Sequence, residues 1–115
     1  MSIPPLIYVA LGGAAGASLR YFFMLYIPFP ILLVNVIGSF IIGITFAKLS
    51  PDHPTYIPFI NIGLLGGFTT FSTFSLELFD LMNSGLILRV FIYAIFTVSA
   101  CLLACFIGTK VGSSI

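Results

Sequence analysis

Four long apolar stretches, separated by short polar or proline-containing segments, divide the chain. A helix of about 20 apolar residues crosses the roughly 30 Å hydrocarbon core of a bilayer, and each stretch is close to that length. The pattern therefore predicts an all-α integral membrane protein that forms a single domain over residues 1–115. The four expected spans are Pro4 to Tyr26, Pro30 to Lys48, Tyr56 to Leu81 and Leu86 to Thr109.

The middle of the third stretch is a poor sequence for a continuous helix. The segment from Gly66 to Ser75 holds two adjacent glycines and five hydroxyl side chains, which weaken a helix or compete for its backbone hydrogen bonds. We expect a break over Gly66 to Thr70. Unwound backbone at membrane depth survives only inside protein or beside a wet cavity, and its carbonyls can then coordinate a cation. The alternative is that these small residues only let helices approach closely, which Gly12 and Gly16 of the first stretch fit best.

Polar side chains form narrow stripes on two of the other stretches. Asn35 and Ser39 are four residues apart in the second, and Tyr93 and Thr97 are four apart in the fourth, so each pair shares one helix face. Such stripes often hold helices together, but amides and hydroxyls are also the donors that a dehydrated anion needs. Both interpretations remain open on spacing alone.

Phe71 and Phe74 lie just beyond the expected break and share a helix face if the helix resumes there. Aromatic rings have a positive edge, so an anion could pass along these rims. Aromatic spacing of this kind is more often plain packing, and periodicity alone favours packing. Together with donors from two helices, the ring edges would form the wall of a pore.

Composition supports a membrane protein and excludes several other classes. Apolar residues make up 60% of the chain and charged residues 6%, whereas a soluble domain carries about 25% charged residues. A net charge of +1 offers no clustered basic face for nucleic acid. No basic segment precedes the long first stretch, which we expect to be a retained span rather than a cleaved signal. Cys101 and Cys105 are interpreted as small packing residues.

The few charges give no clear orientation in the membrane. Lys48 and Lys110 fall on the side that both termini share, and Arg20 and Arg89 fall toward the opposite side. Because an excess of Lys and Arg marks the cytoplasmic face, this tie favours insertion both ways up and an antiparallel pair of identical chains. The alternative is that a partner or lipid fixes one orientation.

Three charges are expected inside the membrane, where their cost marks function by default. Arg20 lies before the end of the first span, and Glu77 and Asp80 lie near the end of the third. We expect Arg20 either to pair with Glu77 or to sit in a water-filled vestibule that draws anions in.

Catalysis finds no support in the residue inventory. The sequence has no nucleotide-binding glycine-rich loop, and its one histidine, His53, lies in the polar loop between the second and third spans without a triad partner. We expect no enzyme activity.

Three segments together resemble one family. They are GGFTTFSTFSLE in the third span, GGAAGASLRY in the first and NVIGSFIIG in the second. In this order they resemble the Fluc (CrcB) bacterial fluoride channels over nearly the whole chain. The resemblance implies a passive, fluoride-selective channel in the bacterial cell membrane, which exports fluoride released when hydrogen fluoride dissociates in the cytoplasm. It also implies an antiparallel dual-topology homodimer with two pores and one structural sodium ion at the dimer centre.

The resemblance assigns roles residue by residue. It implies that Gly66 and Thr69 bind the sodium ion through their backbone carbonyls and that Arg20 lies in the vestibule. The implied pore residues are Asn35, Phe71 and Phe74, continued by Glu77, Tyr93 and Thr97, and Ser39 joins them through its stripe.

Two other functions remain as alternatives. A small multidrug antiporter also has four helices per chain in an antiparallel dimer, but such transporters resemble one another in a carboxylate midway along the first span, which this chain lacks. A non-transporting assembly subunit would use its polar stripes only for helix packing.

Overall fold

The computed structural model describes residues 4–115, and every regular element among them is helical. The elements are α1 Pro5–Tyr26, α2 Pro30–Lys48, η1 Ile57–Leu65, α3 Gly66–Phe68, α4 Phe71–Asn83 and α5 Ile87–Ser114. Four segments are long and apolar enough to cross a membrane: α1, α2, the run from Ile57 to Asn83, and α5. The predicted all-helical class and the four spans are confirmed.

The ends of the spans follow local chemistry. Prolines stand in the first turn of α1, α2 and η1, where their missing N–H costs no hydrogen bond. The last helix continues to Ser114, so the predicted end at Thr109 is wrong. No proline follows Thr109, and the backbone of α5 remains packed on α2 as far as Gly112.

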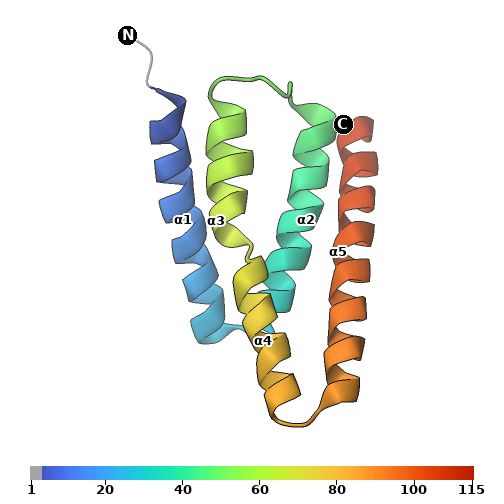
Figure 1. Ribbon diagram of the computed structural model, residues 1–115. Coiled ribbons are helices and arrows are strands. Elements are labelled where there is room, and N and C mark those ends of the chain that lie inside the picture. The colour runs from blue at the N-terminus through green and yellow to red at the C-terminus, as the bar shows by residue number, and fades with distance from the viewer. Residues whose placement is uncertain (1–3) are drawn as a thin grey trace.

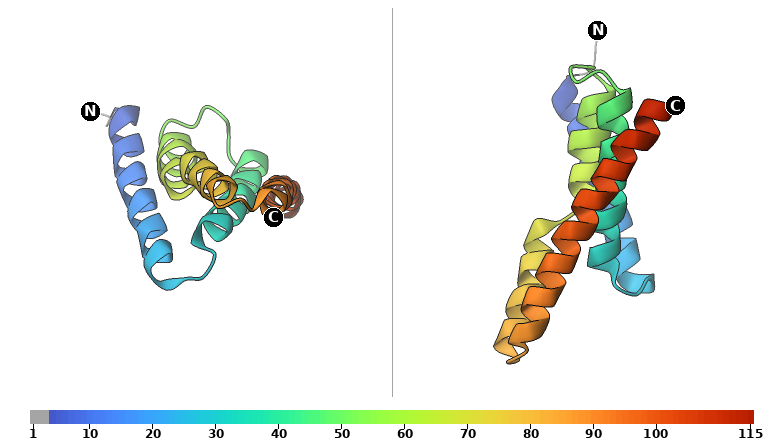
Figure 2. Two further views of the ribbon diagram at one scale, coloured as in Figure 1. Left: turned by 60° about the horizontal axis from the view of Figure 1, so that its bottom comes forward. Right: turned by 90° about the vertical axis from the view of Figure 1, so that its right-hand side faces the viewer.

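The helices pack as two pairs. Helix α1 lies against η1 and α3, while α2 lies against α5, and the two pairs diverge from each other (Figures 1 and 2). Small residues make both contacts close: a Cβ on Gly16 would overlap the carbonyl oxygen of Leu64, and a Cβ on Gly43 would overlap that of Cys105. The packing role predicted for Gly12 and Gly16 is confirmed.

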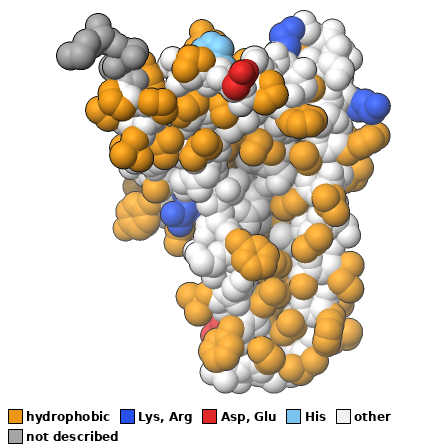
Figure 3. Space-filling model, turned by 45° about the horizontal axis from the view of Figure 1, so that its top comes forward, with side chains coloured by type: hydrophobic (Ala, Val, Ile, Leu, Met, Phe, Trp, Pro, Cys, Tyr) orange, Lys and Arg blue, Asp and Glu red, His pale blue; other side chains and the backbone are white. Residues whose placement is uncertain are grey.

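The outer surface is apolar. Figure 3 shows hydrophobic side chains over most of the visible face and only a few charged ones. Large side chains such as Leu6 and Leu102 stay 77% and 68% exposed, whereas few hydrophobic side chains are buried inside the chain. A bilayer covers such a surface. Because few hydrophobic side chains are buried between its own helices, a single copy has only a small hydrophobic core.

Candidate functional site

The backbone of the third span leaves the helical conformation near the middle of the span. It begins as the π-helix η1, and α3 ends at Phe68. Thr69 (φ −89°, ψ 159°) and Thr70 (φ −154°, ψ 119°) are extended, and α4 begins at Phe71. The Thr70 hydroxyl caps α4 by accepting a hydrogen bond from the backbone N–H of Thr73 at 3.2 Å, because a helix start leaves N–H groups without partners.

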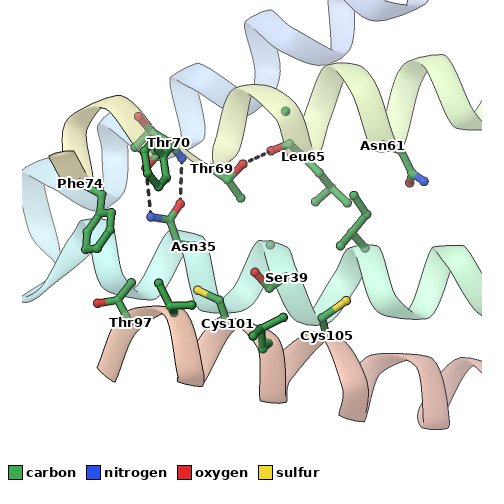
Figure 4. Close-up of a pocket in the computed structure, with 16 residues that line it drawn as sticks. Asn35, Ser39, Asn61, Leu65, Thr69, Thr70, Phe74, Thr97, Cys101 and Cys105 are labelled. Atoms are coloured by element: carbon green, nitrogen blue, oxygen red, sulfur yellow. Dashed lines mark hydrogen bonds between the residues drawn. The ribbon is translucent and has the colours of Figure 1, made fainter. Parts of the chain in front are cut away.

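The side-chain amide of Asn35, in α2, forms the hydrogen bonds to the Thr70 N–H and C=O that neighbouring turns of a continuous helix would form. Its Nδ2 donates to the Thr70 carbonyl at 3.0 Å, and its Oδ1 accepts from the Thr70 N–H at 2.8 Å. Both bonds appear in Figure 4. An amide is the side chain that can serve a backbone N–H and C=O at once. Asn35 therefore holds the extended segment against α2.

The extended segment leaves neighbouring backbone carbonyls without helical donors. The Thr70 N–H, which would reach Gly66 in a continuous helix, is used by Asn35 instead. Outside the helical ladders of residues 4–115, no backbone N–H donates to the carbonyl of Gly66, Phe68 or Thr69, and Gly66 and Thr69 line the same groove. Free carbonyl oxygens are the ligands that a hard cation takes.

Arg20 reaches the third span from its other side. Its Nε donates to the Gly67 carbonyl at 3.1 Å, close to the C-terminal end of α3. A cation near the end of a helix is favourable because the exposed carbonyls carry partial negative charge. Within the described part of the chain, no ion pair joins Arg20 to Glu77, whose Oε1 accepts a 2.6 Å hydrogen bond from Tyr93.

Aromatic rings continue from the extended segment along α4. Phe71 and Phe74 meet edge to face with centroids 5.8 Å apart, and Phe74 meets Tyr93 in the same way at 5.3 Å. Phe74 is 4% exposed, but Phe71 is 76% exposed. The chain itself therefore covers one ring and leaves the other open.

A groove of about 500 Å³ separates the two helix pairs and contains most of the predicted site (Figure 4). The predicted residues that line it are Asn35, Ser39, Gly66, Thr69, Phe71, Phe74 and Thr97. Glu77, Tyr93 and Arg20 are not among the lining residues. Phe74 connects Tyr93 and Glu77 to the groove, whereas Arg20 approaches through Gly67.

Two polar atoms in the groove are buried without a partner in the described chain. They are Thr97 Oγ1 and Asn61 Oδ1. Asn61 was not predicted as a site residue. The available signal was an amide in an otherwise apolar run, IPFINIGLL, where each polar group is costly.

Known proteins are similar to this chain over most of its length. The family model described as "CrcB-like protein, Camphor Resistance (CrcB)" matches residues 7–109. A protein of Hahella chejuensis is 41% identical over 90% of this chain and 91% of its own length, and one of Geobacter sp. (strain M21) is 41% identical over 96% and 98%. A third, of Shewanella pealeana, is 38% identical over 90% and 92%.

All three relatives carry the name fluoride-specific ion channel FluC. The family match covers nearly all of the helical part of the chain, including every residue of the groove. With its four apolar helices, the chain is a multi-pass bacterial membrane protein, and it belongs to the CrcB family.

Proposed function

We propose that this chain is the subunit of a passive, fluoride-selective channel that exports cytoplasmic fluoride and thereby lowers its toxicity. The observation that carries the proposal is the groove in which Asn35, the extended threonines and two phenylalanines meet between the helix pairs. Relatives about 40% identical over most of the chain are named as fluoride channels.

The side chains of the groove suit a small anion. The buried Thr97 hydroxyl has no partner among the described residues, so it can turn its O–H toward a passing ion. Phe74 also lines the groove, and the edge of an aromatic ring is the positive part of its quadrupole. Close donors and ring edges in a narrow path replace the hydration shell of fluoride, and selection over the larger chloride rests on that close fit.

The working unit we propose is an antiparallel homodimer with two pores. Phe71 is 76% exposed beside a groove that a single copy leaves open, so a second copy would complete the wall. Lys48 and Lys110 stand near the ends of α2 and α5, and Arg89 stands in the first turn of α5. With Arg20 they balance the two faces of the membrane, which favours insertion in both directions.

A structural sodium ion is proposed at the centre of this dimer. Gly66 and Thr69 fit such a site because both line one groove beside the extended segment, where backbone carbonyls lack helical donors. Two carbonyls from each copy supply four oxygen ligands of the hard type that alkali and alkaline-earth cations accept. Bound there, sodium would supply positive charge that holds the two copies together.

Phenylalanine variants in liposomes test the proposal. Purified protein is reconstituted with a fluoride gradient, and efflux is followed with a fluoride electrode. We expect rapid efflux in the wild type and strong loss in Phe71→Ile and Phe74→Ile. Phe46→Ile, which changes a 77% exposed ring on α2, is the matched control and should conduct normally.

The same assay separates the alternatives. A multidrug antiporter would give drug flux that depends on a proton gradient, and an assembly subunit would leave the fluoride gradient intact. Fluoride efflux without a proton gradient contradicts both.

A further inference from the structure

Asn61 is the polar side chain that the proposed function leaves unused. It lies in η1, lines the groove, and its Oδ1 is buried without a partner in residues 4–115. Figure 4 shows it on the same side of the groove as Leu65 and farther from Phe74 than Thr69 is. A buried amide without a partner is costly, and π-helical turns occur often at functional sites.

The position of Asn61 along the span sets what can face it. It precedes Gly66 by five residues and Thr69 by eight, which places it about 8–10 Å along the helix axis from the midpoint between those two residues. Phe71 follows Gly66 by five residues and Thr69 by two, across two extended residues, which places it about 6–9 Å on the other side of that midpoint. An antiparallel two-fold axis through the proposed sodium site, between Gly66 and Thr69, would bring these two levels within a few ångströms of each other.

We propose that Asn61 contributes its amide to the ion path formed with a second copy, at the membrane level of the partner's Phe71. This inference rests on the antiparallel dimer of the proposed function. Two copies of Asn61 cannot satisfy each other, because the same axis holds them about 16–20 Å apart along the membrane normal. Phe71, open on its own chain, is the group that reaches that level.

The Asn61 amide can donate to an ion, whereas the Asn35 amide is already hydrogen-bonded. Asn35 uses both its oxygen and its nitrogen on Thr70. A half-turn of the Asn61 amide exchanges its oxygen and nitrogen, so this side chain can present N–H donors to an anion beside the ring edge. The dimer thus has an amide for holding the backbone and a second amide for the ion.

Cross-linking between two differently marked copies tests the placement. One copy carries Asn61→Cys, the other carries Phe71→Cys, and both carry Cys101→Ala and Cys105→Ala. We expect a disulfide-linked dimer in native membranes. The matched control replaces the first substitution with Ile62→Cys, a neighbour that is 58% exposed, and should give little product. Equal cross-linking from positions 61 and 62 overturns the placement.

Fluoride efflux tests the role. Asn61→Leu removes the amide at similar volume. We expect the efflux rate to fall to about one tenth of the wild-type rate or below, because an ion loses a charge-assisted hydrogen bond. Ile62→Leu is the control and should conduct as the wild type does. Wild-type flux with unchanged flux in Asn61→Leu overturns the role of Asn61 alone. Absence of flux in the wild type overturns the proposed function itself.

Discussion

Asn35→Leu should destabilise the protein through the extended segment of the third span. The change removes both hydrogen bonds to Thr70, at 3.0 and 2.8 Å, and bulk water is scarce at this depth to replace them. Each lost bond leaves a backbone group unpaired at a cost of about 1–2 kcal/mol, so the expected loss is about 2–4 kcal/mol. That loss lowers the folded-to-unfolded ratio by about 30- to 900-fold.

Unfolding in mixed micelles measures this loss, and hydrogen exchange at the Thr70 amide reports it locally. Asn83→Leu is the matched control, because it makes the same chemical change at an exposed position at the end of α4. We expect faster exchange at Thr70 in Asn35→Leu and wild-type behaviour in the control. Equal stability of the two variants, with a protected Thr70 amide, would refute the role given to Asn35.

Three further predictions concern other contacts. Gly16→Ala should destabilise the α1 contact by about 1–3 kcal/mol in micelle unfolding, because its Cβ would overlap backbone of η1; unchanged stability contradicts this. Arg20→Leu should cost about 1.5–3 kcal/mol by losing the bond to the Gly67 carbonyl, and should also slow fluoride efflux; wild-type stability would refute the first part. The Ser50 hydroxyl donates to the Asp52 carboxylate and holds the pKa of Asp52 below its ordinary value. This contact therefore stabilises the loop at pH values above the ordinary pKa of Asp, and the stabilisation is lost as the pH falls through the lowered pKa. NMR titration should show a higher Asp52 pKa in Ser50→Ala, and an unchanged value contradicts the assignment.

The spans could be predicted because each rests on local sequence. Length and hydropathy are sufficient for α1, α2 and α5, and prolines mark where helices begin. The run of glycines and hydroxyls also lies where Thr69 and Thr70 are extended, although Gly66 to Phe68 remain helical. Local propensity was informative there because the preference for other backbone states comes from the residues themselves.

The contacts between spans could not be predicted in the same way. Helical spacing places Asn35 and Ser39 on one face but does not say that the Asn35 amide bonds to Thr70. The sequence does not decide between Glu77 and water as the partner of Arg20, and the bond of Arg20 to a backbone carbonyl leaves no sequence pattern. Asn61 was missed because a single amide in an apolar run has no periodicity.

Current measured across a planar bilayer tests the central claim most directly. With fluoride at unequal concentrations on the two sides, chloride making up the difference, and the same pH on both sides, the account predicts a current that reverses near the fluoride equilibrium potential. Phe71→Ile should abolish that current, and Phe46→Ile should leave it intact. A reversal potential set by chloride or by protons, or no current from well-folded protein, would contradict a fluoride path through the groove.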